Sequence, residues 1–119
     1  MSKVLVVEDT VSEMELISEY LRDSGYTVIA TTNAKDALGK IEQHQPNVIV
    51  TDLIMPGMSG LELCRSIKKN PDTNQVSIVV CTSKDQDLDR MWAMRQGADV
   101  YVTKPFSKEQ LVRAVRSVE

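Results

Sequence analysis

Val4-Leu5-Val6-Val7 is a short, unbroken apolar run of mostly β-branched residues near the start of the chain. Such a run is typical of a strand that is covered on both faces, as strands of parallel sheets are. Similar short apolar runs recur along the chain at 27–30, 48–50, 78–80 and 100–102. Together these runs predict five strands of an α/β protein.

Between and after these runs, apolar residues recur at the three- and four-residue spacing of amphipathic helices. The expected stripes are Met14, Ile17 and Leu21; Ala34, Ala37, Leu38 and Ile41; Leu61, Cys64 and Ile67; Leu88, Met91 and Ala98; and Leu111, Val112 and Val115. Gly25, Pro46 and Gly97 mark helix ends, and Ser107 is an N-cap residue for the last helix. Strands that alternate with helices predict a parallel sheet with helices on both faces, because such crossovers are right-handed.

Length and composition limit the classes of function. With 119 residues, we expect a single domain over 1–119. The formal net charge of −3 disfavours binding to nucleic acid. No apolar run approaches the roughly 20 residues that span a bilayer, and the first residues carry no signal-peptide features. We therefore expect a cytoplasmic protein without membrane insertion, in which Cys64 and Cys81 are small buried hydrophobic residues.

Polar side chains follow four of the five predicted strands at their carboxyl ends. They are Glu8 and Asp9, Asp52, Thr82 and Lys104. Taken singly, an acid or a hydroxyl at such a place often caps the next helix, and a lone lysine is usually solvated. Because the carboxyl ends of parallel strands share one edge of the sheet, where ligands bind in open α/β folds, a common site is favoured.

The chemistry of this edge follows from its charges. Glu8, Asp9 and Asp52 would repel one another unless a cation lay among them. Mg²⁺ prefers carboxylate, water and phosphate oxygens, and together with Lys104 it would neutralise the three acids. A carboxylate beside a metal ion and a lysine can attack phosphorus, while the surrounding groups stabilise charge. The residues thus predict a phosphorylation site built on a single nucleophile.

Several motifs together resemble a two-component response-regulator receiver domain over essentially the whole chain. They are Val-Val-Glu-Asp at 6–9, Asp-Leu-Ile-Met-Pro-Gly-Met-Ser-Gly at 52–60, Thr82, Tyr101 and Lys104-Pro105-Phe106. The resemblance implies a flavodoxin-like, CheY-like fold: a doubly wound, five-stranded parallel sheet in the order 2-1-3-4-5 with five helices.

The resemblance also implies which residues accept the phosphoryl group and bind the metal. Asp52 would be the phosphoacceptor. Asp9, with Glu8, would hold Mg²⁺ alongside Asp52 and the backbone carbonyl of Ile54. The phosphoryl donor would be a histidine kinase, and the chain would assist its own phosphorylation and dephosphorylation without being an enzyme in its own right.

The resemblance also implies which residues would take part in the conformational switch on phosphorylation. Thr82 would hydrogen-bond the phosphoryl group, Lys104 would pair with it, and Tyr101 would turn inward on activation. The Lys104–Pro105 bond would be cis, and Gly60 would let the chain turn beside the acceptor loop.

The signal is expected to leave through the surface of the domain. The resemblance implies a face made by the fourth helix, fifth strand and fifth helix, which would bind a downstream protein. Trp92 lies on the fourth helix, where it either packs in the protein or anchors a partner. Of the two, packing is favoured.

A narrower resemblance points to a pathway. Thr82-Ser83-Lys84-Asp85-Gln86 and the stretch 92–98 are similar to the stand-alone regulators of pilus-based twitching motility. Ile54 and Lys84 occupy positions that vary among receivers, and neither side chain readily orients an attacking water. Slow self-dephosphorylation is therefore expected.

Three other functions fit the fold class. A receiver-like scaffold would bind partners without phosphorylation, but the complete set of Asp9, Asp52, Thr82 and Lys104 argues against it. A phosphatase with an aspartyl nucleophile would need a second acidic residue two positions after Asp52, and Ile54 occupies that position. An FMN carrier would need a phosphate-binding loop after the first strand, where Glu8 and Asp9 would repel the phosphate.

Overall fold

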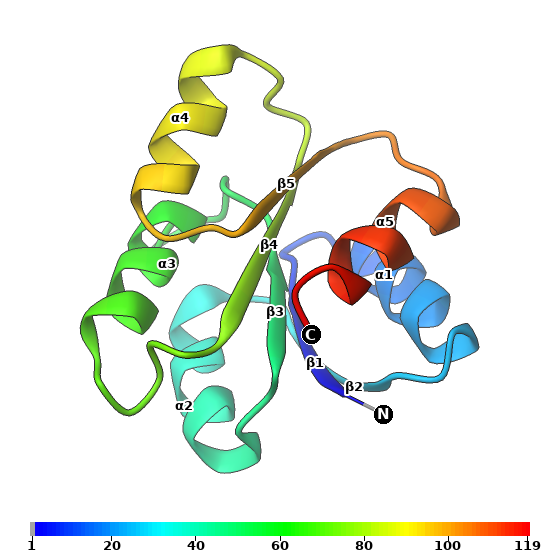
Figure 1. Cartoon of the computed structure of the whole chain (residues 1–119), viewed down its shortest axis with the longest axis horizontal. Helices are drawn as coiled ribbons and strands as arrows, with labels where there is room; N and C mark the ends of the chain where they lie inside the picture. The colour runs from blue at the N-terminus through cyan, green and yellow to red at the C-terminus, as the bar shows by residue number, and fades with distance from the viewer. Residues whose placement is uncertain (1) are drawn as a thin grey trace.

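The computed structural model describes residues 2–119 and contains a parallel sheet in the order β2-β1-β3-β4-β5 (Figure 1). The strands are β1 (Lys3–Val7), β2 (Thr27–Thr31), β3 (Val48–Thr51), β4 (Ser77–Thr82) and β5 (Val100–Thr103). Val4 of β1 lies opposite Val28 of β2 on one side and Val48 of β3 on the other. This order confirms the doubly wound, CheY-like topology that the resemblance implied.

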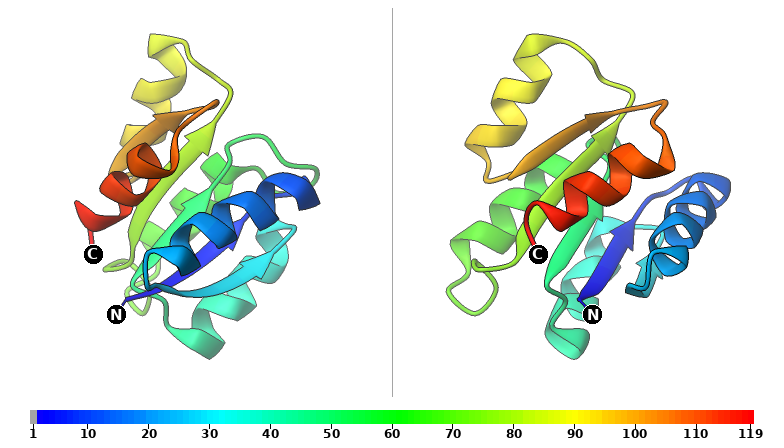
Figure 2. Two further views of the ribbon diagram at one scale, coloured as in Figure 1. Left: turned by 90° about the vertical axis from the view of Figure 1, so that its right-hand side faces the viewer. Right: turned by 45° about the vertical axis from the view of Figure 1, so that its right-hand side comes forward.

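Helices cover both faces of the sheet, as the alternation of strands and helices predicted. They are α1 (Val11–Asp23), α2 (Ala34–His44), α3 (Gly60–Lys69), α4 (Asp87–Arg95) and α5 (Lys108–Arg116). Helices α1 and α5 lie on one face, and α2, α3 and α4 lie on the other (Figures 1 and 2). None of the helices within residues 2–119 is long and apolar enough to cross a membrane.

The central strands are buried on both sides, which explains their unbroken apolar sequences. Leu5 and Ile49 pack in the core under α2, α3 and α4, whereas Val4 and Val50 pack in the core under α1 and α5. Each core takes alternate residues of the same strands, because successive side chains point to opposite faces. The free cysteines divide in the same way: Cys64 lies in the first core and Cys81 in the second.

The buried environment of the two thiols makes them unreactive. Burial raises the pKa of Cys64 and of Cys81 to about 12. A buried thiol that resists ionisation is neither a nucleophile nor a metal ligand at neutral pH. The prediction that these residues serve as small hydrophobic side chains is confirmed.

The helix ends follow local sequence rules. Gly25 and Gly97 adopt φ of 95° and 106° just after α1 and α4, a conformation in which glycine is the least strained residue. The Ser107 side chain accepts a hydrogen bond from the Gln110 amide and caps α5 as predicted. The Lys104–Pro105 peptide is cis, as the resemblance implied.

The predicted apolar stripe of α4 is wrong for two of its three residues. Leu88 and Met91 are exposed, whereas Ala98, just after the helix, is buried, and the buried residue within the helix is Ala93. The small Ala93 side chain lets the α4 backbone sit close to its neighbours, β5 and α3, so the large side chains remain outside. Trp92 is 45% exposed and does not pack in the core, although the Arg95 guanidinium of the same helix lies 5.7 Å from its ring centroid.

Candidate functional site

The polar residues selected from the sequence gather where the strands end. Glu8 follows β1, Asp52 follows β3, Thr82 ends β4 and Lys104 follows β5. Glu8, Asp52 and Thr82 are buried, although each carries a polar side chain. Buried polar groups persist only where other groups satisfy them. The site must therefore be held together by its own interactions.

Lys104 makes the central contacts. Its Nζ lies 2.9 Å from Glu8 Oε2 and 2.9 Å from Asp52 Oδ2. A third carboxylate, that of Glu13 in the first turn of α1, lies 3.1 Å away through Oε1. Burial lowers the pKa of Lys104, but hydrogen bonds from the ammonium to Glu8, Asp52 and Glu13 outweigh this effect and raise the pKa above its usual value. Lys104 thus stays charged and neutralises part of the acidic cluster.

Asp52 is held in the ionised form. Its Oδ1 accepts hydrogen bonds from the backbone amides of Leu53, at 2.6 Å, and Ile54, at 3.2 Å. Burial raises the pKa of Asp52, yet the Lys104 ammonium, the nearby Thr82 hydroxyl and the Ile54 amide together lower it below the usual range. An ionised carboxylate in this position is a competent nucleophile.

Glu8 differs from Asp52 although both contact the same ammonium. Glu8 lies deeper, and burial raises its pKa to about 7 despite the opposing effect of Lys104. Its Oε1 accepts a hydrogen bond from the Thr10 amide at 3.3 Å, at the start of α1. The two acids are thereby separated in proton affinity, and Asp52 is the one that keeps its negative charge most firmly.

The loop that carries Asp52 owes its path to Gly60. A Cβ atom at this position would collide with the backbone carbonyl of Asp52. The Gly60 amide also donates to the Leu53 carbonyl at 2.9 Å. Glycine is needed here for the close approach of two backbone segments, which agrees with its predicted place beside this loop.

Thr82 and Tyr101 are linked through Lys84. Thr82 Oγ1 accepts a hydrogen bond from the Lys84 amide at 3.4 Å, and the Tyr101 hydroxyl donates to the Lys84 carbonyl at 2.7 Å. The Tyr101 ring is buried, and the Arg90 guanidinium of α4 lies 4.9 Å from its centroid. The ring thus already lies inward in this structure, and its movement on activation stays a prediction.

The metal ligands expected from the sequence are only partly assembled. Among residues 2–119, no three His, Cys, Asp or Glu side chains lie closely enough together to hold a metal ion. The reason is that Glu8 and Asp52 converge on Lys104, whereas Asp9 remains exposed. The donor set itself fits a hard cation, because it consists of carboxylate oxygens and includes the ionised Asp52. Magnesium binding stays a prediction.

Glu13 is the site residue that the sequence did not reveal. An acid in the first turn of a helix is usually explained by the helix dipole, so its position alone gave no reason to single it out. The available signal was that α1 begins directly after the acidic pair at residues 8 and 9. A side chain one turn further along that helix can therefore reach back to the same edge of the sheet.

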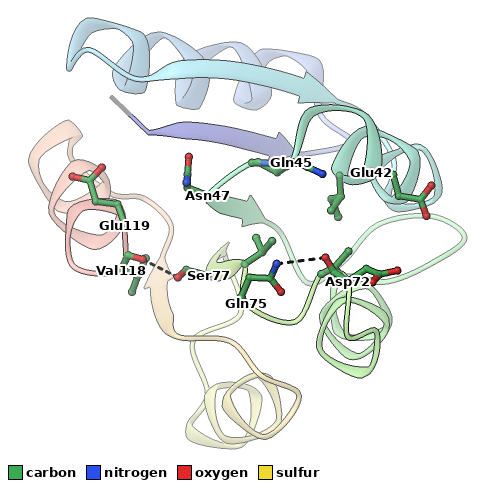
Figure 3. Close-up of a pocket in the computed structure, with 12 residues that line it drawn as sticks. Glu42, Gln45, Asn47, Asp72, Gln75, Ser77, Val118 and Glu119 are labelled. Carbon is green, nitrogen blue, oxygen red and sulfur yellow. Dashed lines mark hydrogen bonds between the residues drawn. The ribbon is translucent and has the colours of Figure 1, made fainter.

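A separate hollow of about 680 Å³ lies at the opposite edge of the sheet, near the amino ends of β3 and β4 (Figure 3). Its walls include Glu42, Asp72 and Glu119, together with Asn47 and Ser77. It contains none of the residues that surround Lys104. Size alone therefore does not identify the functional site of this protein.

Known proteins resemble this chain over nearly its whole length. The family model of the response regulator receiver domain matches residues 4–116. Protein PilH of Pseudomonas aeruginosa is 33% identical over 118 residues, which cover 99% of this chain and 98% of PilH.

Solved structures with the same fold include a chemotaxis protein and a receiver domain. The chemotaxis protein CheY4 of Vibrio cholerae is 28% identical with a TM-score of 0.94, covering 100% of this chain and 99% of that one. The BeF3-activated N-terminal receiver domain of Klebsiella pneumoniae RstA is 28% identical with a TM-score of 0.90, covering 98% of this chain and 97% of that one. The chain therefore belongs to the response regulator receiver domain family.

Proposed function

We propose that this protein is a phospho-accepting response regulator in which a histidine kinase transfers a phosphoryl group to Asp52. The observation that carries the proposal is the contact of Lys104 Nζ with both Asp52 and Glu8, each at 2.9 Å. It supplies a buried, ionised carboxylate beside a fixed positive charge. That pairing is what attack on phosphorus requires.

The residues of the site divide the reaction among them. An Asp52 carboxylate oxygen forms the new bond to phosphorus as the bond to the leaving group of the donor breaks. Lys104 offsets negative charge on the phosphoryl oxygens, and the Thr82 hydroxyl donates a hydrogen bond to one of them. The Leu53 and Ile54 amides keep Asp52 Oδ1 in place. Such fixed dipoles and charges lower the barrier without having to reorient during the reaction.

Magnesium completes the charge balance in this proposal. Glu8, Asp9, Asp52 and the backbone carbonyl of Ile54 would hold the ion, and a bound Mg²⁺ would neutralise charge on the phosphoryl group. The ionised state of Asp52 and the exposure of Asp9 support the assignment, since both carboxylates remain available as oxygen ligands.

The output is proposed to be a change of the α4–β5–α5 face that a downstream protein reads. Phosphorylation adds negative charge and acceptor oxygens beside Thr82. The Thr82 hydroxyl accepts a hydrogen bond from the Lys84 amide, and the Lys84 carbonyl accepts one from Tyr101. Leu88, Met91 and Trp92 are exposed on α4 and provide apolar contact area. Similarity to PilH over nearly the whole chain supports a role in pilus-based motility.

The proposal is tested by intact mass after incubation with acetyl phosphate, with and without Mg²⁺. The wild type is expected to gain about one phosphoryl group only in the presence of Mg²⁺, and Asp52→Ala is expected to gain none. Asp72→Ala serves as the matched control, because Asp72 is an exposed acid at the opposite edge of the sheet. A wild type that gains no mass would instead favour a scaffold that acts without phosphorylation.

The lifetime of the phosphorylated form provides a further test. Ile54 and Lys84 are both exposed beside the site, and neither side chain is suited to orient an attacking water. Slow loss of the phosphoryl group is expected, with faster loss in Ile54→Asn, whose amide can position water. The decay of the phosphorylated fraction, followed by intact mass after the donor is removed, measures this lifetime in the wild type and in Ile54→Asn. Loss from the wild type within seconds would contradict the expectation.

A further inference from the structure

We propose that Glu13 is a positioning residue that restrains phosphorylation by occupying Lys104 until the phosphoryl group displaces it. The inference deepens the proposed function and rests on it. Glu13 lies on α1, and its carboxylate contacts Lys104 Nζ at 3.1 Å.

The first step of the argument is the donor capacity of Lys104. A lysine ammonium has three N–H donors and no acceptor. In this structure Nζ donates hydrogen bonds to Glu8 and Asp52 at 2.9 Å, and the Glu13 carboxylate lies against the ammonium as an ion pair at 3.1 Å. An incoming phosphoryl group therefore shares the ammonium with three carboxylates. It gains most from Lys104 when one of these carboxylates moves away.

The second step identifies the carboxylate that leaves. The side chains of Glu8 and Asp52 are 2% and 11% exposed. Asp52 loses its carboxylate charge when it forms the bond to phosphorus, so its contact with the ammonium weakens in the reaction itself, whereas Glu8 would be left buried without its partner. The Glu13 side chain is 42% exposed, so its charge returns to water when the contact breaks. Of the two glutamates, Glu13 is thus the one that yields to the phosphoryl group.

A purely electrostatic role for Glu13 makes different predictions. If its charge only repelled anionic donors, then Glu13→Asp would behave like the wild type, and the effect of Glu13→Gln would shrink with a less anionic donor. If the contact with Lys104 matters, the shorter Asp side chain loses it, and Gln weakens it, because a neutral amide oxygen holds the ammonium less strongly than a carboxylate does. Each variant would then react faster than the wild type, and its rate increase would be the same with both donors.

The experiment compares initial rates of Asp52 phosphorylation by intact mass, with Mg²⁺ and with acetyl phosphate or phosphoramidate as donor. Glu13→Gln and Glu13→Asp are expected to react roughly two- to five-fold faster than the wild type with both donors, the range set by the strength of an exposed ion pair. Glu15→Gln is the matched control, because Glu15 is an exposed acid of the same helix without a contact to Lys104. Its rate is expected to stay at that of the wild type.

The outcomes separate the two proposals. A wild type that is phosphorylated at the same rate as Glu13→Gln overturns the role of Glu13 and leaves the proposed function intact. A fast Glu13→Gln beside a Glu13→Asp at the wild-type rate also overturns it, because charge and not contact would then matter. A wild type that no donor phosphorylates ends the proposed function, and this inference with it.

Discussion

Helices α3 and α4 lie on the same face of the sheet, yet they are attached to the protein in different ways (Figure 1). Helix α3 buries Gly60, Leu63, Cys64 and Ile67 within ten residues. Helix α4 buries Ala93 within its nine residues and exposes Leu88, Met91, Trp92 and Met94. One helix is part of the core, and the other buries only one small side chain against it.

The difference matches what each helix is connected to. Helix α3 follows the loop that carries Asp52, where a rigid support would keep the proposed nucleophile in place. Helix α4 follows Thr82 and a short segment that contains Lys84. The backbone of Lys84 is hydrogen-bonded both to the Thr82 hydroxyl and to the Tyr101 hydroxyl. Segments with few buried apolar contacts open at low free energy, which is the property that a movable element needs. The comparison thus separates a fixed half of the site from a movable half.

The largest effect is expected for leucine truncation in α3. Leu63 is 0% exposed, and Leu63→Ala is expected to lower the free energy of unfolding by about 2–5 kcal/mol, through lost burial and the remaining cavity. Urea denaturation followed by circular dichroism measures this loss.

The matched control for that truncation is on α4. Leu88 is 59% exposed, and Leu88→Ala is expected to change the free energy of unfolding by no more than about 0.5 kcal/mol. Alanine is also a favourable helix residue, so the substitution does not weaken the helix itself. Similar losses at the two positions would show that α4 is as firmly packed as α3 and would end the comparison.

Glycine substitutions probe the fixed half more locally. Gly60→Ala is expected to cost about 1–3 kcal/mol of unfolding free energy, because its Cβ collides with the Asp52 backbone carbonyl. Gly39→Ala meets no atom within 4 Å on α2, and it is expected to stabilise the protein by about 0.5–1 kcal/mol. Thermal unfolding of both variants gives the two shifts. An unchanged midpoint in Gly60→Ala would mean that the acceptor loop yields, contrary to the rigidity inferred for it.

Much of the fold was predictable because strands that are buried on both faces have continuous apolar sequences. Runs such as Val4 to Val7 show no polar interruption, since both cores take alternate residues of the same strand. Strand order is not visible in the sequence in the same way. The apolar runs show that strands exist but not which strands are neighbours. The order 2-1-3-4-5 therefore depended on the resemblance.

The site was predictable where position alone carried the information. Glu8, Asp52 and Lys104 were identified because residues that follow parallel strands reach one edge of the sheet. Glu13 was missed, since a helical acid gives no hint of the side chain it will meet. The face of α4 was misjudged for a related reason. Leu88 and Met91 have helical spacing, but the small Ala93 decides which side approaches the sheet.

A small effect on stability is also expected at Trp92. A buried tryptophan truncated to alanine typically costs about 3–5 kcal/mol. Trp92 is exposed, and its one charged neighbour on the ring face is Arg95, whose guanidinium lies 5.7 Å from the centroid. Trp92→Ala is therefore expected to cost less than about 1 kcal/mol, a loss that matches an exposed cation–π pair. Urea denaturation of Trp92→Ala, Arg95→Ala and the double variant tests this, because a real pair makes the two losses less than additive. A loss near 3 kcal/mol in Trp92→Ala would place the indole in the core, and α4 would then no longer be the loosely attached element.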